Sequence, residues 1–363
     1  MRLPPVNADR ALRVLERQVS AGDIAGAGLV VWRDDAVAAE HYTGDAAPDL
    51  PAGPTVLWPV ASISKVYTAA MVMRLVEEGE LTLNTPVRVL LPEFTGDGRD
   101  DVKVRHLLTH TAGLMYESPE MEARLAAHTP MCDLIAEAVR SPLLFRPGTE
   151  LRYADYNYLL AGHVAERSTG VPFAELVRTR VLEPAGLSQT FLPPGSEHEG
   201  RIAHTRGAPA AGTSGDMYNS TYARRLAHPA FGAYATTMDL ARFGSMFMPG
   251  GARFLADGSV RAMTSDQTGG VPGTHPSMQG YASDVHVPWA IGFALQTERV
   301  PGLYCDLSSP HTFGHGGATG CVLVCDPECG LVVALTTNTH LRTGRDAWTR
   351  RMQSVVNCVF AGA

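Results

Sequence analysis

The spacing of apolar residues changes twice along this chain and divides it into three stretches. Near the start, a helical pattern over about residues 11–20 precedes an apolar strand, GAGLVVW, and a second strand that ends at Tyr42 and Thr43. Near the other end, strand-like runs return in WAIGFAL, ATGCVLVCD and GLVVALTTN, and an amphipathic helix follows over about residues 345–360. Strands therefore come from both ends of the chain.

The stretch between these strands is mainly helical in pattern. Residues 62–78 are apolar on nearly every side, so we expect a buried helix that ends at Gly79. Its inward positions are Val66, Ala69, Ala70, Met73 and Val76. Short Pro and Gly breaks separate further helical segments over about residues 81–225.

A last helix is predicted in GAYATTMDLARFGSMF, with Thr236 or Thr237 near its cap, and residues 264–288 have the Gly, Pro, Ser and Thr content of a loop. The simplest fold is a sheet built from both chain ends with a helical lobe inserted. We place the sheet domain at residues 1–80 plus 230–363 and the mainly helical domain at residues 81–229, with the active site between them.

Composition places the chain among ordinary globular proteins. Its 363 residues are 45% hydrophobic and 18% charged, which allows a large core. The net charge of -7 and the pI near 6.0 give no basic surface, so we expect neither nucleic acid nor a membrane as a partner. The first residues lack an uninterrupted apolar segment, and no run approaches the roughly 20 apolar residues that span a bilayer, which favours the cytoplasm.

The potential metal ligands have the wrong spacing for a metal site. The six cysteines do not indicate a disulfide framework in a reducing compartment, so free buried thiols are expected. Cys321, Cys325 and Cys329 recur every four residues but lack paired CxxC spacing. His106 and His110 have i, i+4 spacing, but a leucine stands where a zinc protease has Glu. We therefore expect structural histidines, no metal and no cofactor.

Lysine is rare in this chain. Only Lys65 and Lys103 occur among 30 Lys and Arg residues. Arginine stays protonated at any accessible pH, whereas burial can push a lysine amine toward neutrality. On a helix, the segment SISK puts the Ser62 hydroxyl and the Lys65 amine side by side, one turn apart. A serine beside a desolvated amine is a nucleophile beside a base; random survival of one lysine is the alternative.

A tyrosine is the second candidate. In RYADYNYLLAG, Tyr153 precedes a helix that begins near Tyr156. A nearby ammonium would lower the pKa of the phenol, so that Tyr153 and Lys65 could share one proton. Spacing alone favours the plainer alternative, a core aromatic residue with a satisfied hydroxyl.

The segment FGHGGATG is the third candidate. The pair Gly316 and Gly317 at a strand start would let a substrate approach the backbone, whose N–H groups could face an oxyanion. His315 beside them is either a ligand contact or an edge histidine. A phosphate loop is a poor fit, because no helix follows the glycines.

Taken as a set, these segments resemble the serine β-lactamase and penicillin-binding-protein superfamily, in the branch shared by class C β-lactamases, DD-peptidases, family VIII carboxylesterases and transesterases. The resemblance covers about residues 10–340. It rests on VASISK, VRHLLTHTAGL, RYADYNYLLAGHVAERSTG, LEPAGL, TTMDLARF and FGHGGATG with the following DPECGLVVALTTN. It implies an α/β (α+β) fold of the β-lactamase/transpeptidase type, with an antiparallel sheet flanked by helices.

The resemblance also implies roles at matching positions. Ser62 would be the acylated nucleophile, and Lys65 and Tyr153 would share the general acid and base work. The sequence does not decide which of these two removes the serine proton. The backbone N–H groups of Ser62 and Ala318 would form the oxyanion hole.

Two departures from the superfamily pattern bear on the substrate. The lactamases and peptidases carry Asn where this chain has Asp155, whose carboxylate is expected near Lys65. Their third motif opens with a Lys that binds a substrate carboxylate, where this chain has His315, and a mostly neutral imidazole is a poor replacement. Both changes resemble the esterase and transesterase members.

We therefore expect a serine hydrolase that forms an acyl-enzyme, a carboxylesterase acting on small neutral esters. An acyltransferase, transesterase or amide-forming transacylase on a small metabolite would use the same residues. It would differ in whether an acceptor pocket, built by residues 195–229 and 264–288, excludes water. A β-lactamase or D-amino-acid peptidase fits less well. A non-catalytic binding protein fits least, because the nucleophile, the lysine, the tyrosine and the glycine pair are all present.

Overall fold

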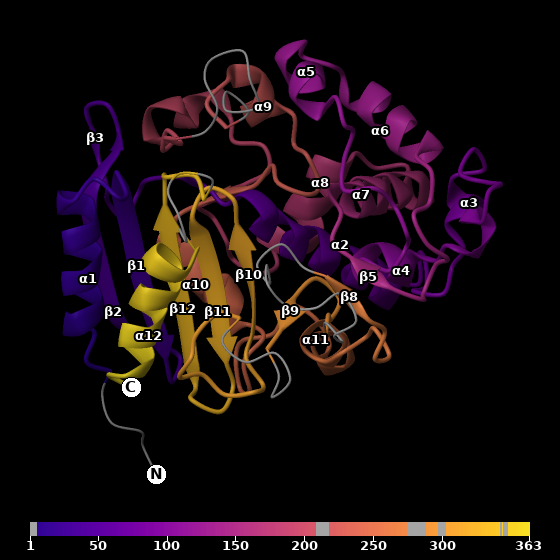
Figure 1. The fold of residues 1–363 in the computed structure, drawn as a ribbon. Coiled ribbons are helices and arrows are strands. Elements are labelled where there is room, and N and C mark those ends of the chain that lie inside the picture. Colours follow the sequence, from indigo (N-terminus) through magenta and orange to yellow (C-terminus); the bar gives the residue numbers. More distant parts are fainter. Residues whose placement is uncertain (1–5, 208–217, 275–287, 297–302, 342, 344–347) are drawn as a thin grey trace.

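The molecule is built around one seven-stranded antiparallel sheet, with strand order β3-β2-β1-β12-β11-β10-β9 (Figure 1). The computed structural model describes residues 6–207, 218–274, 288–296, 303–341, 343 and 348–363. The strands of the sheet are β1 (Gly26–Arg33), β2 (Ala36–Ala47), β3 (Leu50–Pro51), β9 (Ala294–Leu295), β10 (Phe313–Gly317), β11 (Cys321–Asp326) and β12 (Leu331–Thr337).

The centre of the sheet joins the two ends of the chain. Strand β1 pairs with β12 in a register that sets Leu29 opposite Leu335 and Val31 opposite Val333. Both strands are buried almost throughout, which explains their continuous apolar runs. The prediction of one antiparallel sheet with strands from both chain ends is confirmed.

Helices cover both faces of this sheet, because successive strand residues point to opposite sides. On one face, Leu29, Val31 and Val333 pack with the apolar sides of α1 (Asp9–Ser20) and α12 (Ser354–Phe360), which follows a π-helical turn at Trp348–Gln353. On the other face, Val30 and Val332 join a larger core with α10 (Thr237–Ser245) and α2 (Ser64–Glu78).

The remaining helices lie mostly on the far side of α2 from the sheet (Figure 1). They are α3 (Val87–Leu90), α4 (Val104–Leu108), α5 (Met121–Ala126), α6 (Met131–Arg140), α7 (Asp155–Thr169), α8 (Phe173–Val177), the π-helical η3 (Arg178–Leu182), α9 (Thr221–Arg225) and α11 (Asp257–Thr264), with 3-10 turns η1 (Ala61–Ile63), η2 (Arg99–Asp101) and η4 (Ser196–Arg201). Short strands β4 (Trp58–Pro59), β6 (Thr190–Phe191) and β7 (Tyr234–Ala235) form one small sheet, and β5 (Leu151–Arg152) and β8 (Gly273–Thr274) another.

Helix α2 is the buried helix that the sequence predicts. Its residues from Ser64 to Met73 are buried on every side, and the Tyr67 ring stacks on Phe243 of α10 with centroids 4.3 Å apart. Gly79 ends the helix with a φ of 80°, a left-handed conformation that glycine adopts at low cost. This helix is therefore the common packing partner of the sheet side and the helical side.

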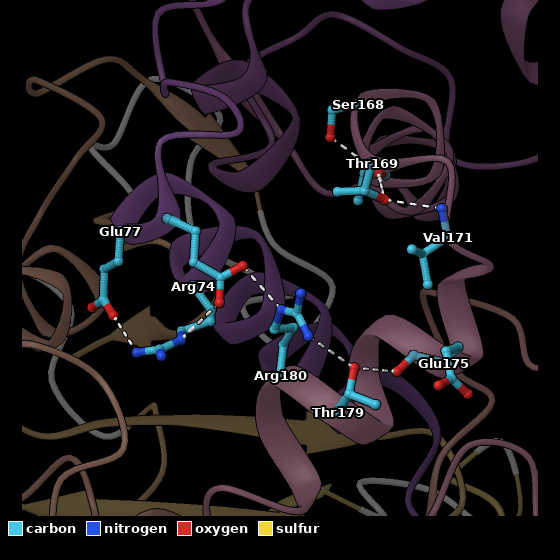
Figure 2. Close-up of polar contacts among 10 residues, drawn as sticks. Arg74, Glu77, Ser168, Thr169, Val171, Glu175, Thr179 and Arg180 are labelled. Atoms are coloured by element: carbon cyan, nitrogen blue, oxygen red, sulfur yellow. Dashed lines mark hydrogen bonds and ion pairs between the residues drawn. The ribbon is translucent and has the colours of Figure 1, made fainter.

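Ion pairs attach the C-terminal end of α2 to its surroundings (Figure 2). Arg74 pairs with Glu77 at 3.0 Å and with Glu78 at 3.1 Å, and Arg180 of η3 reaches Glu78 at 2.9 Å. Glu77 also accepts hydrogen bonds from the Ala256 N–H at 2.7 Å and from a side chain of α11. The end of the helix is thus fixed to both η3 and α11.

The prediction of a strand in WAIGFAL is wrong for most of the segment. Of WAIGFAL, only Ala294–Leu295 forms a strand, the edge strand β9. The chain turns just before it: the Ala290 N–H donates to the Phe293 carbonyl at 2.9 Å, and Gly292 has a φ of 97°. A Cβ at Gly292 would press on Ala69 of α2, so this glycine also allows close packing.

A second correction concerns the glycine pair. Gly316 and Gly317 end strand β10 and do not start a strand, because FGHGG forms a hairpin with CVLVCD in which His315 lies opposite Leu323. The turn between the strands has its left-handed residue at Gly320, with a φ of 88°. Three of the five residues of β10 are glycines, so the strand shows no alternation of apolar and polar side chains. The sequence therefore did not indicate β10.

Other expectations are met in part where the structure describes them. Thr236 caps α10, because its side chain accepts from the Asp239 N–H at 3.2 Å. The predicted loop at 264–288 contains the two-residue strand β8. Parts of three predicted segments lie outside the described residues: 275–287 of this loop, 208–217 of the expected acceptor pocket and 344–347 of the final helix. All six cysteines are free thiols, but burial holds only for Cys305, Cys321 and Cys325, whereas Cys132 is exposed.

Candidate active site

Ser62 lies where the chain enters helix α2. It occupies the 3-10 turn η1 between two buried neighbours and is itself partly exposed. The preceding residue, Ala61, has a φ of 46°, a left-handed conformation that is strained for a residue with a side chain. Ser64 holds the turn, because its hydroxyl donates to the Ala61 carbonyl at 2.6 Å and accepts from the Ala233 N–H at 2.8 Å. The Ser62 hydroxyl is thereby presented by a rigid backbone.

Lys65 sits one turn later, fully buried, with three oxygen atoms around its Nζ. The Ser62 Oγ lies 3.3 Å away, the Ala230 carbonyl 3.1 Å and the Asp155 Oδ1 2.7 Å. The predicted contact between Ser62 and Lys65 is therefore present. Burial lowers the pKa of Lys65 below its ordinary value, and this effect outweighs the opposite influence of the Asp155 carboxylate.

Tyr153 lies on the other side of Ser62, just before helix α7. Its hydroxyl hydrogen-bonds with Ser62, and Lys65 Nζ lies over its ring, 4.7 Å from the centroid. Burial and the charge of Asp155 raise the pKa of this phenol well above its ordinary value. The expectation that the ammonium would lower this pKa is wrong, because desolvation and a neighbouring carboxylate both favour the neutral phenol.

Asp155 is the first residue of α7, and its side chain is only 7% exposed. The Asp155 N–H donates to the Tyr116 carbonyl at 2.7 Å, which anchors the start of the helix. The expected proximity of this carboxylate to Lys65 is confirmed by their 2.7 Å contact, a close ion pair whose angles fall outside those of a hydrogen bond.

The end of strand β10 forms the sheet side of the site. A Cβ at Gly317 would collide with the Val60 carbonyl, so this glycine lets β10 approach the backbone just before Ser62. Within the segment 313–320, only Gly316 and Ala318 reach solvent. The buried His315 donates its Nδ1–H to the Gly316 carbonyl at 2.8 Å, and its ring lies 6.1 Å from that of Tyr153.

His110 is a site residue that sequence reasoning placed among structural histidines. Its ring lies 4.3 Å from that of Tyr153. Its carbonyl accepts from the Arg152 N–H at 2.9 Å, and its Nδ1 accepts from the Ala154 N–H at 3.1 Å. Both backbone neighbours of Tyr153 are thus bound to one histidine. His110 has a φ of 58° and follows the end of α4, so it does not share a helical face with His106.

The Ala230 carbonyl was also missed, and no signal in the sequence could have identified it. It reaches Lys65 because the segment around Pro229 packs on α2, where the Thr68 hydroxyl donates to the Pro229 carbonyl at 2.7 Å. Within the described residues, no three or more His, Cys, Asp or Glu side chains are grouped as they would be around a metal ion. No helix among the described residues is long and apolar enough to cross a membrane.

Known proteins share the sequence pattern and the fold of this chain. The sequence profile of the family described as Beta-lactamase matches residues 12–356. Penicillin-binding protein 4 of Amycolatopsis lactamdurans is 29% identical over 303 residues, which cover 78% of this chain and 72% of that protein. Esterase EstB of Burkholderia gladioli is 32% identical over 194 residues, 49% of this chain and 48% of that protein. The solved structure of EstCE1, described as a hydrolase with promiscuous acyltransferase activity, has the same fold, with a TM-score of 0.78 and 21% identity over 97% of this chain and 98% of that one.

Proposed function

The chain belongs to the β-lactamase family of serine hydrolases, and from this premise we propose that it is a carboxylesterase that cleaves small neutral esters through an acyl-enzyme on Ser62. The observation that carries the proposal is the 3.3 Å contact between Ser62 Oγ and the buried Lys65 Nζ. A serine becomes a useful nucleophile only when a neighbouring group takes its proton.

Lys65 acts as the base. A neutral amine has two N–H donors and one lone pair. The Ala230 carbonyl accepts one N–H group at 3.1 Å, and the Asp155 carboxylate attracts the other from 2.7 Å, which leaves the lone pair for the Ser62 hydroxyl. When Ser62 attacks the ester carbonyl, its proton moves to Nζ, and the resulting ammonium keeps the same oxygen partners.

Tyr153 acts as the acid. Because its pKa is raised well above the ordinary value, the phenol holds a proton at neutral pH and donates it to the leaving alkoxide. The Lys65 ammonium then returns its proton to the Tyr153 phenolate, so both groups are restored. Water attacks the acyl-enzyme in the second half, passes its proton to the same pair, and the pair reprotonates Ser62 as the acid leaves. The N–H groups of Ser62 and Ala318 are proposed to stabilise the oxyanion.

The charges around Ser62 favour a neutral substrate. The Lys65 amine beside the nucleophile already faces the Asp155 carboxylate, 2.7 Å away. His315 supplies a buried imidazole whose Nδ1–H is used by the Gly316 carbonyl. Neither group offers an unpaired charge to a substrate carboxylate. Losing one charge-assisted contact commonly costs about 1.5 to 3 kcal/mol, roughly one to two decades in rate if the contact is made in the transition state.

The test compares two substrates at the same site. We expect kcat/KM for an aryl acetate or butyrate to exceed that for a chromogenic cephalosporin by about 10- to 100-fold or more over pH 6 to 9. Cephalosporin turnover equal to or faster than ester turnover would reject the esterase in favour of a lactamase. His315→Lys should improve anionic substrates selectively and leave neutral esters nearly unchanged. Alcohols or amines added to the same assay measure any acyl transfer in competition with hydrolysis.

The cytoplasmic location of the protein stays a prediction.

A further inference from the structure

We propose that Asp155 is a positioning residue for the chemistry: its carboxylate fixes the Lys65 amine against Ser62 and stabilises the ammonium formed when Lys65 takes the serine proton. Ser62, Lys65 and Asp155 then form a proton-transfer triad. This inference rests on the proposed function, because it assigns a role within the same acylation step.

The contact between Lys65 and Asp155 is short and shielded from water. Lys65 Nζ lies 2.7 Å from Asp155 Oδ1, with side-chain exposures of 0% and 7%. A charge interaction in such surroundings is much stronger than at the surface, because little water screens it. The same burial makes either charge costly without the other. Asp155 therefore acts on Lys65 at close range.

The backbone holds the carboxylate in place. Asp155 begins α7, and its N–H donates to the Tyr116 carbonyl at 2.7 Å. The N-terminal end of a helix favours a negative charge, and Asp155 lies at that end of α7. Tyr153 lies two residues earlier in the same anchored segment, so the acid and the carboxylate are placed together.

The proton transfer creates a positive charge on Lys65, next to the Asp155 carboxylate. The Oγ–H bond of Ser62 breaks as Oγ attacks the carbonyl carbon, and the proton becomes the third N–H of Lys65. Asp155 takes no proton in this step. A fixed anion beside a developing cation lowers the barrier without reorganising at the moment of reaction.

Other titratable groups face Lys65, and three of them stay neutral. The phenol rings of Tyr153 and Tyr158 lie 4.7 Å and 5.8 Å from Nζ, and burial raises the pKa of each well above its ordinary value, so both stay neutral. Burial lowers the pKa of His228 to about 3, so it stays neutral as well. Glu117 adds a second negative influence on Lys65. It is unchanged when Asp155 is substituted.

The experiment is the pH dependence of Ser62 acylation. Acylation by an aryl ester is followed in single-turnover mode over about pH 5 to 10, with intact mass as the readout. The reactive form is the neutral amine, so the rate rises as pH passes through the pKa of Lys65. Asp155 raises that pKa; its removal therefore moves the rising limb to lower pH. For Asp155→Asn we expect the rising limb to move to lower pH by about 1 to 3 units. We also expect the plateau of the acylation rate at high pH to be about tenfold lower, because a weaker base remains.

A matched control removes a carboxylate that does not touch Lys65. Glu150 pairs with Arg152 at 3.6 Å and its side chain is 44% exposed, so Glu150→Gln should leave the limb in place. Asp155→Ser, a smaller neutral residue, should repeat the shift and keeps the test usable if the Asn variant is unstable. A slower Asp155→Asn with an unmoved limb would overturn the inference.

Ser62→Ala separates this inference from the proposed function. If Ser62→Ala is still acylated and turns over ester, the proposed function fails. If Ser62→Ala is inactive while the limb of Asp155→Asn stays where it is in the wild type, only the role of Asp155 fails.

Discussion

Helix α2 carries ion pairs at both of its ends, and the two sets lie in opposite surroundings. At the N-terminal end, Lys65 and Asp155 have side-chain exposures of 0% and 7%. At the C-terminal end, Arg180 and Glu78 have exposures of 39% and 26%. One helix thus shows what an ion pair does inside a protein and what it does near the surface.

The difference teaches where electrostatics serves stability and where it serves chemistry. An exposed pair typically contributes about 0 to 1 kcal/mol and weakens with salt. A buried pair gains strong attraction but loses the hydration of both charges, so it is a poor way to stabilise a fold. Lys65 and Asp155 lie beside a serine hydroxyl, where a titratable amine has a use. We infer that the buried pair is kept for reactivity.

Among changes to the two ion pairs, the largest effect is expected from changing the base while keeping its charge. In Lys65→Arg, a guanidinium can still pair with Asp155 but cannot give up its proton. We expect kcat/KM for an aryl butyrate to fall by about 10²- to 10⁴-fold, the usual contribution of a general base. Wild-type activity in Lys65→Arg would show that the rarity of lysine in this chain has no bearing on the mechanism.

The next effect concerns stability and breaks the buried pair. Lys65→Met keeps the length of the side chain but leaves the Asp155 carboxylate buried without its cation, which should cost about 3 to 5 kcal/mol in the free energy of unfolding. Urea unfolding measures this loss. The double variant Lys65→Met/Asp155→Asn should recover most of it and remain inactive. A single and a double variant of equal stability would contradict the coupling between the two charges.

A smaller effect is expected from His110, which acts through Tyr153. His110→Ala removes the ring and the Nδ1 acceptor and should lower kcat about tenfold with KM little changed, since a misplaced acid slows chemistry. His110→Asn is the matched control: Asn tolerates the positive φ of 58° and its Oδ1 can accept from the Ala154 N–H. Equal losses in the two variants, or a change confined to KM, would argue against a positioning role.

The smallest effect is expected at the other end of α2. Arg180→Ala removes the contact with Glu78 and should lower the free energy of unfolding by at most about 1 kcal/mol, less at high salt. Ester turnover should stay at the wild-type level. Chemical unfolding at two salt concentrations, with parallel kcat/KM measurements, checks both statements. A loss as large as that of Lys65→Met would erase the distinction between the two ends.

The parts of this molecule that sequence predicted are those that depend on local chemistry. Ser62 and Lys65 are three residues apart, so a helix alone brings them together. Gly79 and Thr236 mark helix ends through their own backbone preferences and side-chain bonds. Of the sheet strands that were found, β1, β11 and β12 carry long apolar runs.

The parts of the site and fold that could not be predicted from sequence depend on contacts between distant segments. The Ala230 carbonyl meets Lys65 across 165 positions, and His110 reaches the segment around Tyr153 across 44. The pKa of Tyr153 went the opposite way from the expectation because burial and Asp155 outweigh the nearby ammonium. Strand β10 escaped notice because glycines that permit close approach to Val60 carry no strand pattern.

The proposed chemistry requires that Ser62 carries the acyl group. The most direct measurement is intact mass followed by peptide mapping after rapid quenching of the protein with an aryl butyrate, alongside Ser62→Ala. We predict one butyryl group on the peptide that contains Ser62 in the wild type, and neither adduct nor turnover in the variant. An adduct on another residue, or ester turnover by Ser62→Ala at the wild-type rate, would contradict the account.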